Sequence, residues 1–173
     1  IDAKALAVAK EALSALGSVD GAAVELTDEG SVAAATGAVM RTHGRIDILV
    51  NNAAITYFIP VDDFPERRMK LMFEVQVFGP FHLAQLVLPK MRERKSGWIL
   101  NISSHAALHP KVNAPGRGGT VYGMCKAALE RFTTGLAAEA SNDKIGVSVI
   151  SPGLVATPGG LRHKLVNESN KDM

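Results

Sequence analysis

The sequence has few cysteines, few aromatic residues and almost no excess of charge of either sign. Cys125 is the single cysteine among 173 residues, which excludes an internal disulfide and any metal site built from several cysteines. This usage is typical of a reducing compartment, so we expect a cytoplasmic protein. The 19 basic and 17 acidic residues are interspersed. No basic stripe therefore predicts binding to nucleic acid or to a membrane surface.

Long apolar runs are also missing. Residues 1–4 carry no basic region followed by an apolar stretch, and nowhere do about 18 uncharged apolar residues occur together. The sequence therefore predicts neither a secretory signal nor a membrane span. With 47% hydrophobic and 21% charged residues, the chain has the composition of a packed soluble domain. Its length predicts one domain over residues 1–173.

Helical and extended patterns alternate along the chain. The third of four predicted helices is adjusted near Gly79 and Pro80, where proline removes a backbone donor, and the second is N-capped at Thr27. The predicted helices are 3–16, 27–44, 66–91 and 121–140, and the predicted strands are 22–26, 46–50, 97–102 and 145–150. This alternation predicts an α/β fold, an open parallel sheet with helices on both faces.

Small and polar residues follow three of the predicted strands. Residues 51–54 read Asn-Asn-Ala-Ala, Ser103 and Ser104 come next along the chain, and residues 151–153 read Ser-Pro-Gly, with Thr157 close behind. Ligands of parallel sheets bind outside the carboxyl ends of the strands, so these residues are candidates for one site. The alternative is that strand ends are polar and turn-like in any case.

Tyr122 and Lys126 stand four residues apart near the start of the last predicted helix. That spacing places the two side chains on one face, one turn apart. A free phenol has a pKa of about 10, and a nearby ammonium favours the phenolate. The pair therefore predicts a tyrosine that works as an acid or base near neutral pH.

Four short motifs occur in the order typical of one enzyme family. They are Asn-Asn-Ala-Ala at 51–54 after the strand 46–50, Asn-Ile-Ser-Ser at 101–104, Tyr-Gly-Met-Cys-Lys at 122–126, and Pro-Gly-Leu-Val-Ala-Thr at 152–157. In these motifs the chain resembles the short-chain dehydrogenase/reductase family over essentially its whole length. The resemblance implies a Rossmann-like, doubly wound parallel sheet. It also implies hydride transfer between NAD or NADP and a small alcohol or carbonyl substrate, with the choice of cofactor left open.

The resemblance assigns catalytic roles to four residues. Tyr122 would exchange the proton on the substrate oxygen, and Lys126 would lower the pKa of Tyr122 and bind the nicotinamide ribose. Ser104 would hold the substrate oxygen. Gln76 stands where the family usually has an asparagine that orders a water in a proton relay, and glutamine offers the same amide one methylene further out.

The resemblance also implies a set of cofactor-binding residues. Besides Tyr122 and Lys126, they lie near the adenine, along the adenosine ribose, or around the nicotinamide. In that order they are Glu25 and Leu26; Asn52, Ala53 and Ala54; and Pro152, Gly153, Val155 and Thr157.

Parts of the family pattern are not found in these 173 residues. They are the opening strand with its glycine-rich pyrophosphate turn, the second strand and the closing strand. In the family's strand order this leaves a gap of about 10 Å between the strands 22–26 and 46–50. We therefore expect the residues to belong to a longer polypeptide. The stretch between Ser104 and Tyr122 is longer than in the family and is either a lid over a large substrate or an insertion.

Three other hypotheses compete with the oxidoreductase hypothesis. The chain could be a non-catalytic remnant of such an enzyme, acting as a scaffold or interaction subunit. Ser104 and His105 resemble a hydrolase pair, but no Gly-x-Ser-x-Gly elbow surrounds the serine. His105 and His109 have no evident third ligand for a metal, so none is expected.

The resemblance further implies a homodimer or homotetramer. The family commonly packs the long helix and the tyrosine-bearing helix against their symmetry mates. The predicted face on the tyrosine-bearing helix is apolar and consists of Ala127, Ala128, Phe132, Leu136 and Ala137.

Overall fold

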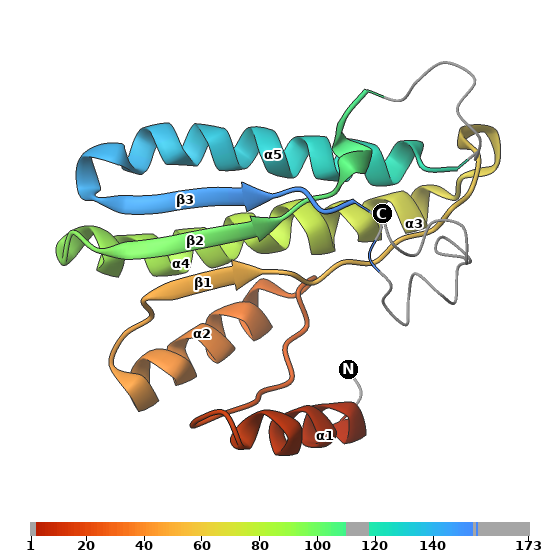
Figure 1. Ribbon diagram of the computed structural model, residues 1–173. Coiled ribbons are helices and arrows are strands. Elements are labelled where there is room, and N and C mark those ends of the chain that lie inside the picture. Colours follow the sequence, from red (N-terminus) through yellow and green to blue (C-terminus); the bar gives the residue numbers. More distant parts are fainter. Residues whose placement is uncertain (1–2, 110–117, 154, 156–173) are drawn as a thin grey trace.

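Three parallel strands form one sheet in the order β1-β2-β3. The computed structural model describes residues 3–109, 118–153 and 155 (Figure 1). The strands are β1 (Ile48–Asn51), β2 (Gly97–Ile102) and β3 (Ile145–Ile150). The helices are α1 (Ala3–Ser14), α2 (Glu29–His43), α3 (Glu66–Phe73), α4 (Gly79–Glu93) and α5 (Thr120–Ala140).

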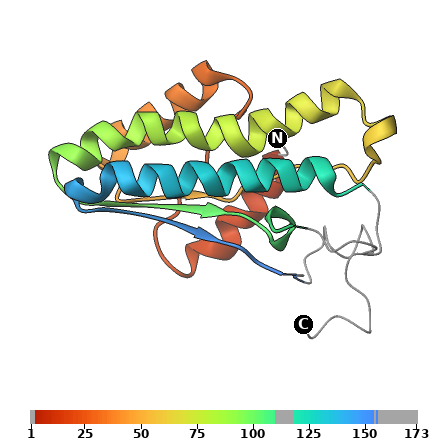
Figure 2. The ribbon, with the colours of Figure 1, turned by 90° about the horizontal axis from the view of Figure 1, so that it is seen from above.

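Helices lie on both sides of this sheet. Figure 2 shows α4 and α5 side by side on one side of the strands, with α1 on the other. In β2 alternate side chains point toward α4 and α5 and are buried there. Ile99 is 1% exposed and Asn101 is 0% exposed. Trp98 points to the opposite face and is 60% exposed. The predicted α/β class, a parallel sheet with helices on both faces, is confirmed.

The hydrophobic core fills the space between the sheet and its two long helices. Each helix contributes one apolar stripe, and the strands contribute the residues that point toward it. The buried members of this core are Ala84, Val87, Leu88, Met91, Ile99, Leu136, Ala140 and Ile145. A second, smaller cluster of Met72, Val121 and Cys125 lies nearer the carboxyl ends of the strands. The core thus holds α5 rigidly against β2 and β3.

A π-helical turn over Glu74–Phe78 connects α3 to α4, within the stretch that the sequence predicted as one long helix. Here the Gly79 N–H donates to the Glu74 carbonyl, five residues back. Pro80 has no N–H, so the regular four-residue partner of the Gln76 carbonyl is missing, and the widened turn accommodates this. By length and composition alone the run Glu66–Glu93 is also apolar enough to cross a membrane. Met72, Ala84 and Met91 of this run are buried inside the protein.

Two predictions about the N-terminal third are wrong. Residues 22–26 are not a strand, because no other described segment pairs with them and a strand requires a hydrogen-bonded neighbour. Helix α2 is capped by Asp28 and not by Thr27: the Asp28 Oδ1 accepts a 2.7 Å hydrogen bond from the Ser31 N–H. Asp28 caps more effectively because its carboxylate also complements the positive end of the helix dipole.

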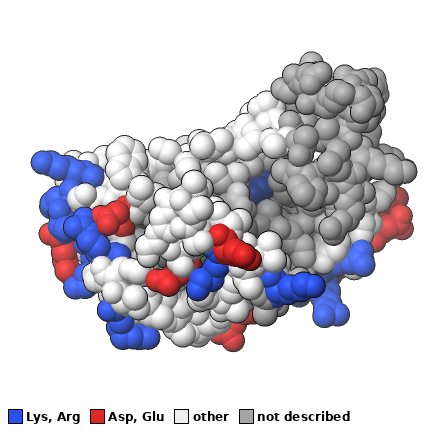
Figure 3. Space-filling view, turned by 60° about the horizontal axis from the view of Figure 1, so that its bottom comes forward, with Lys and Arg blue, Asp and Glu red and all other residues white. Residues whose placement is uncertain are grey.

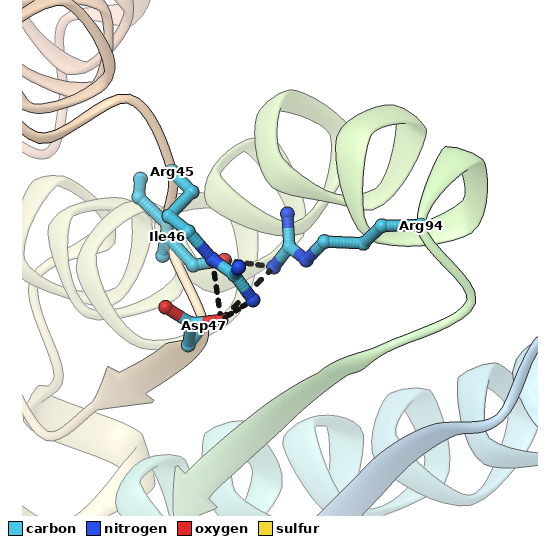
Figure 4. A network of polar contacts seen from close by, with 4 residues as sticks. All are labelled: Arg45, Ile46, Asp47 and Arg94. Atoms are coloured by element: carbon cyan, nitrogen blue, oxygen red, sulfur yellow. Dashed lines mark hydrogen bonds and ion pairs between the residues drawn. The ribbon is translucent and has the colours of Figure 1, made fainter.

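Charged residues bind one another and the backbone at the amino end of β1. Arg94, just after α4, donates to the Ile46 carbonyl, and Arg45 donates through Nε to Asp47 at 2.9 Å (Figure 4). The Arg94 contact attaches the end of α4 to the segment that leads into β1. On the face seen in Figure 3, basic and acidic side chains are interspersed, as the sequence predicts.

Candidate active site

Tyr122, Lys126 and Ser104 come together where α5 passes the carboxyl end of β2. The Ser104 side chain lies beside the Tyr122 hydroxyl and acts on its pKa. One turn further along α5, the Lys126 Nζ donates to the Ile102 carbonyl at 2.8 Å and lies 5.6 Å from the centroid of the Tyr122 ring. Ser104, which lies 18 residues before Tyr122 in the sequence, thus joins Tyr122 and Lys126 in one polar group.

Burial controls the electrostatics of this group. Burial raises the pKa of Tyr122 above its usual value near 10, and the hydrogen bond with Ser104 opposes that rise. Burial also lowers the pKa of Lys126, which is only 2% exposed. The sequence predicted that Lys126 lowers the pKa of Tyr122. In the structure the pKa of Tyr122 is raised instead, so this prediction is wrong. The Lys126 ammonium is held by the Ile102 carbonyl, and burial of the Tyr122 phenol outweighs the opposing effect of Ser104 on its pKa.

A short 3-10 turn, His105–Ala107, fixes the position of Ser104. The Ser104 Oγ accepts a 3.2 Å hydrogen bond from the Ala106 N–H, which orients the hydroxyl. Helix α5 passes close to this turn at Gly123, where a Cβ would lie 2.6 Å from the Ala106 carbonyl oxygen. Glycine at 123 therefore lets Tyr122 approach Ser104.

Gln76 is buried in the π-helical turn, 1% exposed. Its Nε2 donates to the Ile55 carbonyl at 2.9 Å, so its amide is attached to the segment after β1 and not to Ser104, Tyr122 or Lys126. Its Oε1 is buried and has no hydrogen-bond partner among the described residues. A buried amide oxygen needs a donor, and a bound water is the usual one.

Most of the predicted cofactor-binding residues flank the carboxyl ends of the strands. Asn52, Ala53 and Ala54 are exposed just beyond β1, and Pro152 and Gly153 follow β3. The His105 N–H donates to the Pro152 carbonyl at 3.0 Å, which joins the segments after β2 and β3. Val155 is 56% exposed, and Thr157 lies outside the described residues.

Glu25 and Leu26 precede α2 and do not end a strand. The Glu25 Oε1 accepts a 2.9 Å hydrogen bond from the Thr27 hydroxyl, and this bond lowers the pKa of the exposed Glu25 carboxyl. Leu26 packs against the start of α4 at Gly79. The carboxylate of Glu25 is thus engaged in a local turn.

Two polar networks beside the site were not predicted from the sequence. The Asn51 Nδ2 donates to the Asn101 Oδ1 at 2.8 Å, and the Asn101 Nδ2 donates to the Thr133 hydroxyl at 2.8 Å. These three side chains are buried and join β1, β2 and α5. This network could have been recognised in the sequence from the two asparagines near the ends of neighbouring strands, since Asn51 pairs with Asn101 in the sheet register.

The second network is centred on Glu130, one turn beyond Lys126. One carboxylate oxygen, Oε1, accepts hydrogen bonds from the Ser103 hydroxyl at 2.6 Å and the Ser151 hydroxyl at 3.1 Å. The four-residue spacing of Tyr122, Lys126 and Glu130 was the signal for this network. As for metals, no cluster of three His, Cys, Asp or Glu residues occurs within the described part of the chain.

The chain matches known proteins in both sequence and structure. A family model described as short chain dehydrogenase matches residues 1–165. A mouse protein, dehydrogenase/reductase SDR family member 7B, is 37% identical over 133 residues, which are 77% of this chain and 40% of that protein. The chain therefore spans less than half of this relative's length.

Solved structures share the fold. A metagenomic short-chain oxidoreductase in complex with NADP is 31% identical, with a TM-score of 0.79 over 89% of this chain and 68% of the other. An NAD+-bound xylitol dehydrogenase is 27% identical, with a TM-score of 0.84 over 95% of this chain and 62% of the other. The arrangement of strands and helices described above is thus common to enzymes that bind either coenzyme.

Proposed function

Because the chain belongs to the short-chain dehydrogenase family, we propose that it is part of an NAD(P)-dependent oxidoreductase. The reaction is the transfer of hydride between the coenzyme and an alcohol or carbonyl substrate. The observation that carries this proposal is the meeting of Ser104, Tyr122 and Lys126 at the carboxyl end of β2. Ligands of parallel sheets bind at that edge.

The residues around Lys126 fit a nicotinamide coenzyme. An ammonium has three N–H donors, and the one described acceptor of Lys126 is the Ile102 carbonyl. The remaining donors suit the hydroxyls of a ribose. Asn52, just beyond β1, and Pro152, just beyond β3, would line the coenzyme. When bound, the coenzyme supplies or accepts the hydride.

The chain's own residues manage the charge and the proton. Reduction of a carbonyl builds negative charge on its oxygen. The Ser104 hydroxyl donates a hydrogen bond to that oxygen, and Tyr122 delivers a proton to it. In the reverse direction Tyr122 accepts the proton, and the Lys126 ammonium stabilises the phenolate. Gln76 would hold a water through its unpartnered Oε1.

The proposal includes a homo-oligomer acting in the cytosol. Apolar side chains remain exposed between α4 and α5: Phe81 is 41% exposed and packs edge to face on Phe132 at 5.7 Å. Leu136, expected on the contact face, is only 6% exposed and belongs to the chain's own core. The contact face therefore centres on Phe81 and Phe132.

Coenzyme binding and turnover by the full-length protein test this proposal. NADH and NADPH are titrated by their fluorescence, and a panel of ketones, aldehydes and alcohols is screened by the absorbance of reduced nicotinamide. We expect saturable binding of at least one coenzyme and turnover of at least one substrate. Absence of both would favour a non-catalytic scaffold related to these enzymes. Covalent labelling of Ser104 by an activated phosphonate would favour a hydrolase.

A further inference from the structure

We propose that Glu130 is a positioning residue that joins the two strand ends of the active site. Resting on the function proposed above, the inference concerns how the segment carrying Ser104 is held relative to the segment carrying Pro152 and Gly153. Neither Ser103 nor Ser151 has a role in the catalysis described so far. Both donate to one oxygen of Glu130.

Helix α5 contacts the end of β2 and the two residues after it at three successive turns. Tyr122 lies beside Ser104, the Lys126 Nζ donates to the Ile102 carbonyl, and Glu130 accepts from the Ser103 hydroxyl. The first two contacts belong to the catalytic group. The third lies one helical turn deeper, and it alone also reaches the end of β3, through Ser151.

Burial makes the Glu130 contact specific. Ser103 is 4% exposed and Glu130 is partly buried, so water competes weakly for these hydrogen bonds. A carboxylate accepting two hydroxyl donors forms bonds stronger than those between neutral groups. The 2.6 Å distance to Ser103 is at the short end of the usual range.

Backbone bonds on either side of Ser104 depend on the same strand spacing. The Ser103 N–H donates to the Ile150 carbonyl at 2.7 Å, and the His105 N–H donates to the Pro152 carbonyl at 3.0 Å. Ser104, which would hold the substrate oxygen, lies between these two bonds. Pro152 and Gly153, which would face the nicotinamide, follow Ser151 directly. Glu130 thus sets the separation between the substrate oxygen and the nicotinamide.

The first test measures the strand ends directly, by hydrogen exchange of the full-length protein without coenzyme. Glu130→Ala should speed exchange of the Ser103 and His105 amides about tenfold, because two hydrogen bonds are lost. Ile99, deeper in β2, should keep its rate. The matched control is Glu93→Gln, an exposed carboxylate paired with Lys90 on α4. Unchanged Ser103 and His105 rates in Glu130→Ala would overturn the proposal.

The second test separates positioning from general stability. Binding of NADH or NADPH is compared with binding of ADP-ribose or its 2′-phosphate, which lack nicotinamide. Glu130→Ala should weaken the binding of the whole coenzyme at least about fivefold and change the fluorescence emission of the bound nicotinamide. The affinity for the fragment should stay within about twofold of wild type. Glu130→Gln, whose amide oxygen still accepts from both serines, should restore coenzyme binding. Equal losses for coenzyme and fragment would overturn the positioning role.

The two proposals fail in different ways. If the wild-type protein binds no dinucleotide, the oxidoreductase proposal fails, and with it the catalytic purpose of Glu130. Faster Ser103 and His105 exchange in Glu130→Ala would still establish Glu130 as a side-chain contact that stabilises the ends of β2 and β3.

Discussion

The buried Lys126 ammonium donates to the Ile102 carbonyl at 2.8 Å, across the gap between α5 and the end of β2. The bond fixes the ammonium beside Tyr122, and burial lowers the pKa of Lys126. The protein thus keeps a desolvated cation at a buried position where an apolar side chain would have a lower desolvation cost. A substitution of Lys126 should therefore lower turnover strongly and change the free energy of unfolding only a little.

We predict that Lys126→Met lowers turnover by at least about a hundredfold. It should change the free energy of unfolding by less than about 1 kcal/mol, because relief of the buried charge offsets the lost hydrogen bond. Steady-state kinetics and urea unfolding of the full-length protein check the two parts. A loss of about 3 kcal/mol or more in stability would mean that Lys126 is chiefly structural.

Tyr122→Phe should abolish turnover and leave coenzyme affinity within about threefold, because it removes the proton donor and keeps the ring that packs at the site. Tyr57→Phe is the matched control, since Tyr57 is the only other tyrosine and its ring lies against Arg68. It should retain full activity. Undiminished turnover in Tyr122→Phe would refute the acid–base role.

The raised pKa of Tyr122 predicts different pH dependences for the two reaction directions. Below that pKa the phenol is protonated, so carbonyl reduction should be nearly independent of pH from about 6 to 8. Alcohol oxidation needs the phenolate and should speed up as pH rises over the same range. Profiles of kcat/KM in both directions measure this. A plateau of the oxidation rate below about pH 7 would show that bound coenzyme reverses the effect of burial.

Cys125 should be unreactive in the native protein. The thiol is fully buried between Met72 and Val121, and burial raises its pKa to about 11. At pH 8 roughly one thiol in a thousand is ionised. We expect iodoacetamide to label Cys125 only after unfolding, as mapped by peptide mass spectrometry. Rapid labelling of the folded protein would show that α5 separates from α3.

Phe81→Glu should lower the molar mass of the assembly in solution, because a charge would enter the apolar face between α4 and α5. Light scattering measures the mass. Val61→Glu is the control, since Val61 is 64% exposed but lies in the 3-10 turn before α3. A wild-type protein with the mass of one polypeptide would remove the oligomer from the proposal.

The sequence by itself determined the elements whose local patterns are strong. The apolar runs of β2 and β3 and the long amphipathic helix α5 were predicted almost to the residue. The four-residue spacing of Tyr122 and Lys126 also follows from helix geometry alone. The four motifs at 51–54, 101–104, 122–126 and 152–157 then pointed to the family, which the match over residues 1–165 confirms.

Tertiary structure decided what depends on neighbours. Residues 22–26 have a strand-like composition but no hydrogen-bonded partner, so the strand does not form in the described chain. The pKa of Tyr122 was predicted from its distance along the helix to Lys126, yet it is controlled by burial, which no local pattern encodes. The bonds of Glu130 to Ser103 and Ser151 join three separate elements. Such contacts exist only once the sheet and α5 have packed together.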